Sequence, residues 1–167
     1  MKTSSLAGSV AVLVSLAACS PPATTPPPAP DAVAIKTALD KEIAKFVPIM
    51  NSKDPAALAA VFTPDATWIL PDASTFMGTA AITAGAKAFF DSMESFVAES
   101  AVIDKLVVVS DTEAVTFSHG LSMLKMKGMK QAEHHNNPFA DHWKKRATGW
   151  QVDYEINADG SVPPTKP

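Results

Sequence analysis

The sequence has few groups that could cross-link a fold or bind a metal. Its only cysteine is Cys19, so no intramolecular disulfide can form, and it contains neither a CxxC nor an HExxH pattern. His134 and His135 are adjacent and would point to opposite faces of a strand, so we expect no metal site there. The fold must therefore depend on a hydrophobic core.

The sequence also lacks a strong charge of either sign. The formal net charge is −3 at pH 7, which argues against a nucleic acid as partner. We find no internal repeat and no glycine-rich phosphate-binding loop, and we expect no cofactor. The apolar run near the start is too short to span a bilayer.

The first residues are typical of a secretory signal. Lys2 precedes the apolar run "LAGSVAVLVSLAA", and Leu16-Ala17-Ala18-Cys19 resembles the bacterial lipobox. That resemblance implies removal of residues 1–18 and lipid attachment to Cys19. Ser20 resembles the residue of lipoproteins sent on to the outer membrane, so we expect a lipid-anchored protein of the cell envelope, at the periplasmic face of the outer membrane.

The proline content separates a tether from a folded domain. Residues 20–30, "SPPATTPPPAP", contain six prolines, which predicts an extended, semi-rigid tether over 19–30. The remaining residues suffice for one domain over 31–160, followed by a flexible tail over 161–167.

The order of elements predicts an α+β fold. Asp31 and Asp54 are expected to cap two helices, Pro48 to disturb the last turn of the first one, and a third helix to cover 79–93. Strands are predicted over 65–71, 99–109, 113–126, 133–146 and 150–157, with a loop over 71–78. Helices first and long antiparallel strands last favour a curved sheet wrapped against helices.

Two stretches carry a family resemblance. "MNSKDPAALAAVFTPDATWILPDASTFMG" and "DHWKKRATGWQVDYEIN" resemble the entry segment and the closing hairpin of the nuclear-transport-factor-two-like superfamily, in its SnoaL-like and ketosteroid-isomerase-like branches. The resemblance implies a cone-shaped barrel of a strongly curved, mostly antiparallel sheet, with a pocket at its open end. It also implies a homodimer as an option, through the convex sheet face. Because such folds serve isomerases, dehydratases, cyclases and binding proteins, the fold does not fix the function.

Strand parity predicts which side chains face the pocket. On 113–126 the apolar set Val115, Phe117, His119, Leu121 and Met123 is expected to point inward. We place Trp68 inward because of its bulk. These side chains, together with Trp143, are the predicted ligand-binding set, although aromatic residues at strand parity usually belong to the core.

Asp141 lies on the apolar face of its strand. Phe139, Asp141 and Trp143 share one face, and a turn at Thr148-Gly149 would place Asp141 opposite either Ile156 or Tyr154. Both registers leave Asp141 inside and within reach of the Tyr154 hydroxyl. Asp141 is then a ligand contact, a catalytic acid or a structural tie to Tyr154.

A comparison with ketosteroid isomerase disfavours that reaction. The resemblance places the isomerase's base at Leu70 and its tyrosine at Phe46, and only its protonated acid is retained, at Asp141. We therefore predict a domain that binds a small apolar or aromatic molecule.

Two alternatives remain. One is an acid/base isomerase, cyclase or dehydratase that uses His119 as base with Asp141 or Tyr154 as donor, although a His in this position is more often a satisfied core residue. The other is a dimeric assembly protein, which an exposed apolar patch on the convex sheet face would support.

Overall fold

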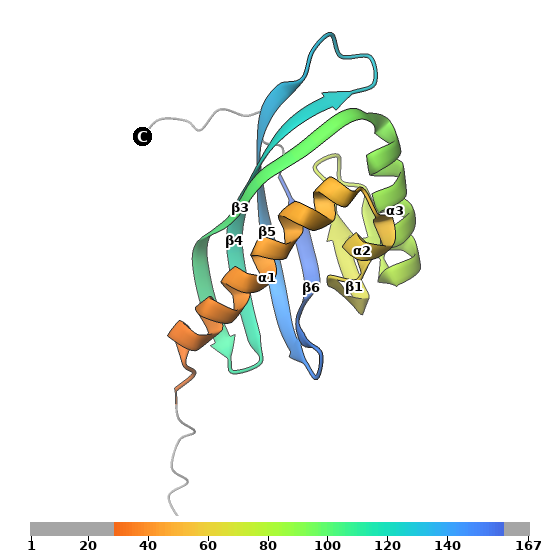
Figure 1. Cartoon of the computed structure of the whole chain (residues 1–167). Helices are drawn as coiled ribbons and strands as arrows, with labels where there is room; N and C mark the ends of the chain where they lie inside the picture. The colour runs from red at the N-terminus through yellow and green to blue at the C-terminus, as the bar shows by residue number, and fades with distance from the viewer. Residues whose placement is uncertain (1–28, 159–167) are drawn as a thin grey trace, which may run out of the picture.

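The computed structural model describes residues 29–158, in which helices pack on one face of a curved sheet (Figure 1). The elements follow in the order α1 (Ala32–Ser52), α2 (Pro55–Ala59), β1 (Phe62–Ile69), β2 (Thr75–Met77), α3 (Gly78–Ser92), β3 (Met93–Ser110), β4 (Glu113–Met126), β5 (Glu133–Arg146) and β6 (Gly149–Asn157). The predicted signal, Cys19, all but the last two residues of the tether, and the predicted tail lie outside the described residues. No helix of the described part is long and apolar enough to cross a membrane.

The sheet curls without closing. Its strand order is β2-β1-β6-β5-β4-β3, with β2 and β3 at the two edges. β1 and β6 run parallel, whereas every other pair of neighbours is antiparallel. Figure 1 shows α1 lying diagonally across the concave face and α2 and α3 beside β1. This architecture confirms the predicted α+β cone of curved sheet and N-terminal helices.

Both predicted helix caps are present. The Asp31 carboxylate accepts the N–H groups of Val33 and Ala34 at the start of α1. The Asp54 carboxylate accepts the N–H groups of Ala56 and Ala57 at the start of α2, where Pro55 occupies the first helical position and has no N–H group that needs an acceptor. Local sequence is therefore sufficient to fix both starting points.

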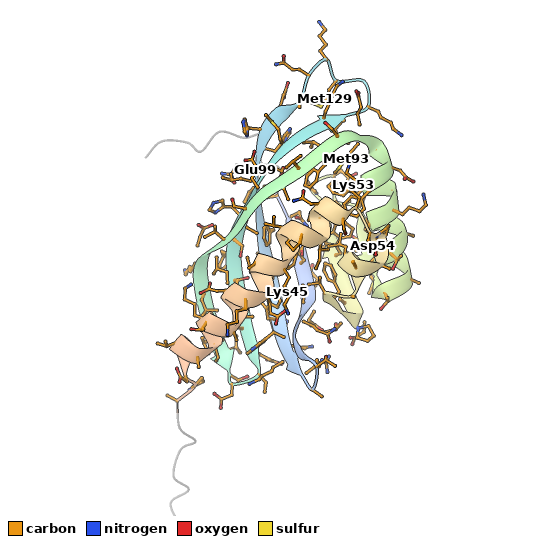
Figure 2. All side chains as sticks on the ribbon, viewed as in Figure 1. Lys45, Lys53, Asp54, Met93, Glu99 and Met129 are labelled. Carbon is orange, nitrogen blue, oxygen red and sulfur yellow. The ribbon has the colours of Figure 1, made fainter. Side chains whose placement is uncertain are left out.

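The end of α1 differs from the prediction. The helix continues through Pro48 to Ser52, and it ends at Lys53, whose φ of 52° is left-handed. Figure 2 labels Lys53 and Asp54 at the corner where the chain turns from α1 into α2. A left-handed residue at this place terminates a helix, whereas a proline near its end does not.

Three strands differ from their predicted bounds. β1 begins at Phe62 rather than 65, and the short strand β2 lies within the predicted loop 71–78. β3 begins at Met93, directly after α3, because its first residue pairs with Met126 at the end of β4. Pairing partners extend these strands beyond the segments that the sequence pattern marks.

The core lies between α1 and the concave face of the sheet. Leu39 and Ile43 of α1 are fully buried, and the Phe46 ring lies 6.5 Å from the Trp143 indole of β5, edge to face. At the end of α1, the Asn51 side chain accepts from the Ala98 N–H at 2.7 Å and donates to the Ala98 carbonyl at 3.0 Å. These contacts hold α1 over the sheet and leave a space beside its C-terminal half.

Candidate functional site

That space is a cavity of about 170 Å³. It lies between the C-terminal half of α1 and the concave face, near the ends of β1 and β6. Its lining is mostly apolar and includes Phe46, Met50, Trp68, Leu70, Phe96 and Phe139. Among the described residues, Glu155 is the only ionisable one that lines the cavity, and other polar groups come from Asn137, Asn157 and two serines. An apolar hollow with few polar groups is the usual form of a small-molecule site.

A row of four side chains crosses the concave face beside this cavity. The strand register aligns Thr116 of β4 with Asp141 of β5, Asp141 with Glu155 of β6, and Glu155 with Trp68 of β1. All four are buried, with exposures of 0 to 5%. Two carboxyl groups therefore lie side by side on the adjacent strands β5 and β6, away from water.

Hydrogen bonds fix the β4 and β5 half of the row. The Trp143 Nε1–H donates to Thr116 Oγ1 at 2.9 Å, and the Thr116 hydroxyl donates to Asp141 Oδ2 at 3.3 Å. Asp141 Oδ1 is buried without a hydrogen-bond partner among the described residues. The Asp141 carboxyl is thus oriented by a hydrogen bond from the neighbouring strand β4.

The β6 and β1 half is fixed in the same way. Glu155 Oε1 accepts from the Trp68 Nε1–H at 2.8 Å and from the Asn157 side-chain amide at 2.6 Å. That amide also donates to the Ile69 carbonyl at 3.3 Å. Glu155 Oε2, like Asp141 Oδ1, is buried without a donor of its own.

Burial makes both carboxyl groups harder to ionise. Burial raises the pKa of Asp141 well above its usual range, and the adjacent Glu155 carboxyl raises it further. Burial also raises the pKa of Glu155, while the hydrogen bonds from Asn157 and Trp68 oppose this. Asp141 is therefore the group of the pair whose charged form is disfavoured more strongly.

Three predicted inward positions are confirmed. Asp141 and Trp143 are fully buried, and Trp68 is 4% exposed. Of these, Trp68 borders the cavity, whereas Asp141 and Trp143 lie behind the lining. Trp143 is thus part of the core and supports the site through Thr116.

The predicted contact between Asp141 and Tyr154 is wrong. β5 and β6 start in the register that pairs Trp143 with Val152, and a β-bulge then leaves Asp153 without an opposite residue. Beyond the bulge the side chains of β6 change faces, so Glu155 points inward and Tyr154 is 38% exposed. Asp141 consequently lies opposite Glu155.

The predicted inward face of β4 is also wrong. Small side chains of β4 are buried instead, and Phe117 is 46% exposed on the other face. His119 points outward as well, where its Nδ1 lies 2.8 Å from the Asp104 carboxylate. Small residues on β4 leave room for α1 and for the Trp143 indole. Leu121 borders the cavity although it is partly exposed.

The proposed trio of His119, Asp141 and Tyr154 therefore does not converge on one space. Asp141 lies on the concave face, and the other two side chains lie on the convex face. No group of three or more His, Cys, Asp or Glu side chains that could hold a metal ion occurs within residues 29–158.

Sequence reasoning missed Glu155. Simple alternation placed Trp150, Val152, Tyr154 and Ile156 on one inward face, and Glu155 on the outward one. The available signal was Asn157, a second polar residue of the same parity next to the apolar segment. Leu70 and Phe46, the positions aligned with the isomerase's base and tyrosine, both border the cavity as apolar side chains.

Comparisons with known proteins identify the fold and the family of the chain. A search among curated proteins found no match. Among solved structures, the fold is similar to hexachlorocyclohexane dehydrochlorinase LinA-type3 from Novosphingobium barchaimii, with a TM-score of 0.66, 13% identity and coverage of 81% of this chain and 97% of that one. An NTF2-like protein with a cystatin-like fold from Novosphingobium aromaticivorans gives a TM-score of 0.60 at 17% identity, covering 79% and 86%.

A domain of unknown function with a cystatin-like fold from Nostoc punctiforme gives a TM-score of 0.63 at 17% identity, covering 78% and 80%. At these identities the likenesses show the fold alone. The sequence itself matches the SnoaL-like domain over residues 43–154, well over half of the chain. The protein therefore belongs to the SnoaL-like domain family.

Proposed function

We propose that the domain binds a small, largely apolar molecule in the cavity beside α1. The observation that carries this proposal is an apolar hollow of about 170 Å³ with a single ionisable side chain, Glu155, at its wall. Aromatic and aliphatic side chains supply most of the contact area, and the polar groups near Glu155 orient one end of the ligand.

Binding is favoured over the acid/base enzyme built on His119. That enzyme requires its base and its donor to reach a common space, and His119 lies on the convex face, bonded to Asp104. Leu70 and Phe46 supply neither a base nor a hydroxyl to the cavity.

A cavity-filling variant tests the proposal. Ala101 borders the cavity, and its neighbour Val102 is exposed on the other face of β3. Titration with ethylbenzene, followed by tryptophan fluorescence and calorimetry, should show saturable binding to the wild type and to Val102→Phe. Ala101→Phe should abolish it. Equal binding by both variants would place the ligand elsewhere, and no binding to the wild type would contradict the proposed function.

We also infer that the domain is lipid-anchored through Cys19 in the cell envelope, at the periplasmic face of the outer membrane. The support is the lipobox-like Leu16-Ala17-Ala18-Cys19 and the proline-rich segment after it. The described chain starts at the N-terminal end of α1, and the cavity lies beside the C-terminal half of that helix. A tether would thus join the domain at the end of α1 farther from the cavity.

We further infer that two copies associate through the convex face of the sheet. The support is a set of exposed apolar side chains on the neighbouring strands β3 and β4 and on β6, which is separated from β4 by β5: Val102, Val107, Phe117, Tyr154 and Ile156. Sedimentation should show a dimer that Phe117→Lys dissociates. Val33→Lys, at an exposed apolar residue of α1, is the control and should leave the dimer intact.

A further inference from the structure

We propose that the ligand of this cavity carries a protonated amine on its apolar body, and that Glu155 receives this amine. The inference rests on the proposed small-molecule function and specifies its ligand class. It follows from the hydrogen-bonding groups and from the charges that surround the cavity.

The hydrogen-bond donors near Glu155 are already in use. The Trp68 indole and the Asn157 amide both donate to Glu155 Oε1, and the Asn157 amide also donates to the Ile69 carbonyl. Acceptors remain: Glu155 Oε2 is buried without a donor of its own, and no donor to Asn157 Oδ1 is found within residues 29–158. A site with spare acceptors and committed donors fits a ligand that donates.

The charge around the cavity has one sign. Glu155 faces Asp141 and Thr116 across β5 and β4, Trp68 on β1 and Asn157 on its own strand, and none of these is basic. α1 contributes apolar side chains to the lining, and no Lys, Arg or His within residues 29–158 borders the cavity. A negative charge on Glu155 would therefore have no cation beside it among the described residues that line the cavity.

Such a charge is costly in an apolar setting, and an incoming cation would offset the cost. A protonated amine forms charge-assisted hydrogen bonds to carboxylate and amide oxygens. An alcohol donates a single, weaker hydrogen bond. A carboxylate ligand would place a second negative charge against Glu155 without a donor to receive it.

A matched ligand series tests this on the wild-type protein. Calorimetric titration at pH 7 with phenethylamine, 2-phenylethanol and phenylacetate compares three head groups on one apolar body. We expect the amine to bind about ten- to a hundredfold more tightly than the alcohol, and phenylacetate not to bind measurably.

Three isosteric variants locate the effect. Glu155→Gln retains the acceptor for Trp68 and removes the charge, so the advantage of the amine over the alcohol should disappear. Asp141→Asn leaves the charge on Glu155, so the advantage should persist. Asp153→Asn is the control, because Asp153 lies two residues earlier on β6 and bonds His142 and Lys144 on the other face. Circular dichroism melts identify any variant that fails to fold, and the ligand series on the wild type does not depend on them.

The possible outcomes distinguish the amine proposal from the proposed binding of a small apolar molecule. If ethylbenzene and 2-phenylethanol bind but phenethylamine has no advantage, the amine proposal is overturned and the binding function stands. If phenylacetate binds most tightly, the charge argument is wrong. If none of these ligands binds, the proposed function fails first.

Discussion

At the residue scale, the molecule places two carboxyl groups where water cannot reach them. Asp141 is fully buried and Glu155 is 5% exposed, and together they bond Thr116, Trp68 and Asn157. A buried carboxyl pair does little to stabilise a fold, because the free-energy cost of removing charge from water exceeds the gain from the hydrogen bonds. Glu155 of this pair lies at the wall of the apolar cavity, where the proposed ligand would contact it.

The raised pKa of Asp141 predicts how stability depends on pH. Because this pKa is raised in the folded state, the contribution of Asp141 is fully present below the unfolded pKa of about 4 and is lost as pH rises toward the folded value. Asp141→Asn carries no such loss. Urea unfolding at a series of pH values from about 4 upward should therefore show the variant gaining stability relative to the wild type as pH rises.

Asp153→Asn is the control for this experiment. Burial raises the pKa of Asp153, but the hydrogen bonds from Lys144, His142 and Thr63 lower it by more, so its net shift is downward. Its contribution is present above the unfolded pKa and is lost as pH falls, the opposite sign. If the difference in stability between Asp141→Asn and the wild type did not change with pH, a raised pKa of Asp141 in the folded state would be excluded.

At the element scale, single contacts decide how helices sit on the sheet. The Asn51 side chain forms two hydrogen bonds with the Ala98 backbone. At this place β3 changes register against β4, between Ala98 and Ser100. The contact connects the end of α1 to the bend in the edge strand.

Asn51→Ala should therefore cost about 1–3 kcal/mol of unfolding free energy, because it removes one donor and one acceptor from the Ala98 peptide. Urea unfolding measures this cost. Ser52→Ala is the control: its hydroxyl bonds only within the same turn and to the next residues. A cost for Asn51→Ala no larger than for Ser52→Ala would show that the bend forms without the contact.

The packing of α3 on β2 requires a residue without a side chain at Gly85. A Cβ at Gly85 would lie 2.8 Å from ring atoms of Phe76, closer than atoms in contact allow. The Phe76 ring in turn lies 5.7 Å from Trp68, which borders the cavity.

Gly85→Ala should thus destabilise the domain by about 1–2 kcal/mol, since the overpacking exceeds the gain in helix propensity of about 1 kcal/mol. The double variant with Phe76→Leu should recover part of this loss, which a double-mutant cycle in thermal unfolding would measure. A stabilised Gly85→Ala protein would contradict the close approach of α3 to β2.

At the scale of the whole molecule, the attachment of the chain to a membrane is the main open prediction. Cys19→Ser should leave an unprocessed or released protein when cells are fractionated, because lipid attachment requires the thiol. The wild type should be found in the membrane fraction at the mature size. A variant that still partitioned with membranes at the mature size would refute the lipobox hypothesis.

The sequence by itself determined the fold class, both helix caps and the burial of Asp141, because these depend on local capping and on the apolar face of one regular strand. It also marked the family through two segments whose order and spacing persist. Each of these features is a property of neighbouring residues.

Only the tertiary structure decided which side chains meet in the site. The alternation of side chains between the two faces predicts their direction only while a strand is regular. The bulge at Asp153 turned Glu155 inward and Tyr154 outward. On β4 both faces carry apolar residues, and the approach of α1 and Trp143 selected the face with small side chains as the buried one. A bulge and a helix approach arise from contacts between distant segments, so the periodicity of a single strand does not predict them.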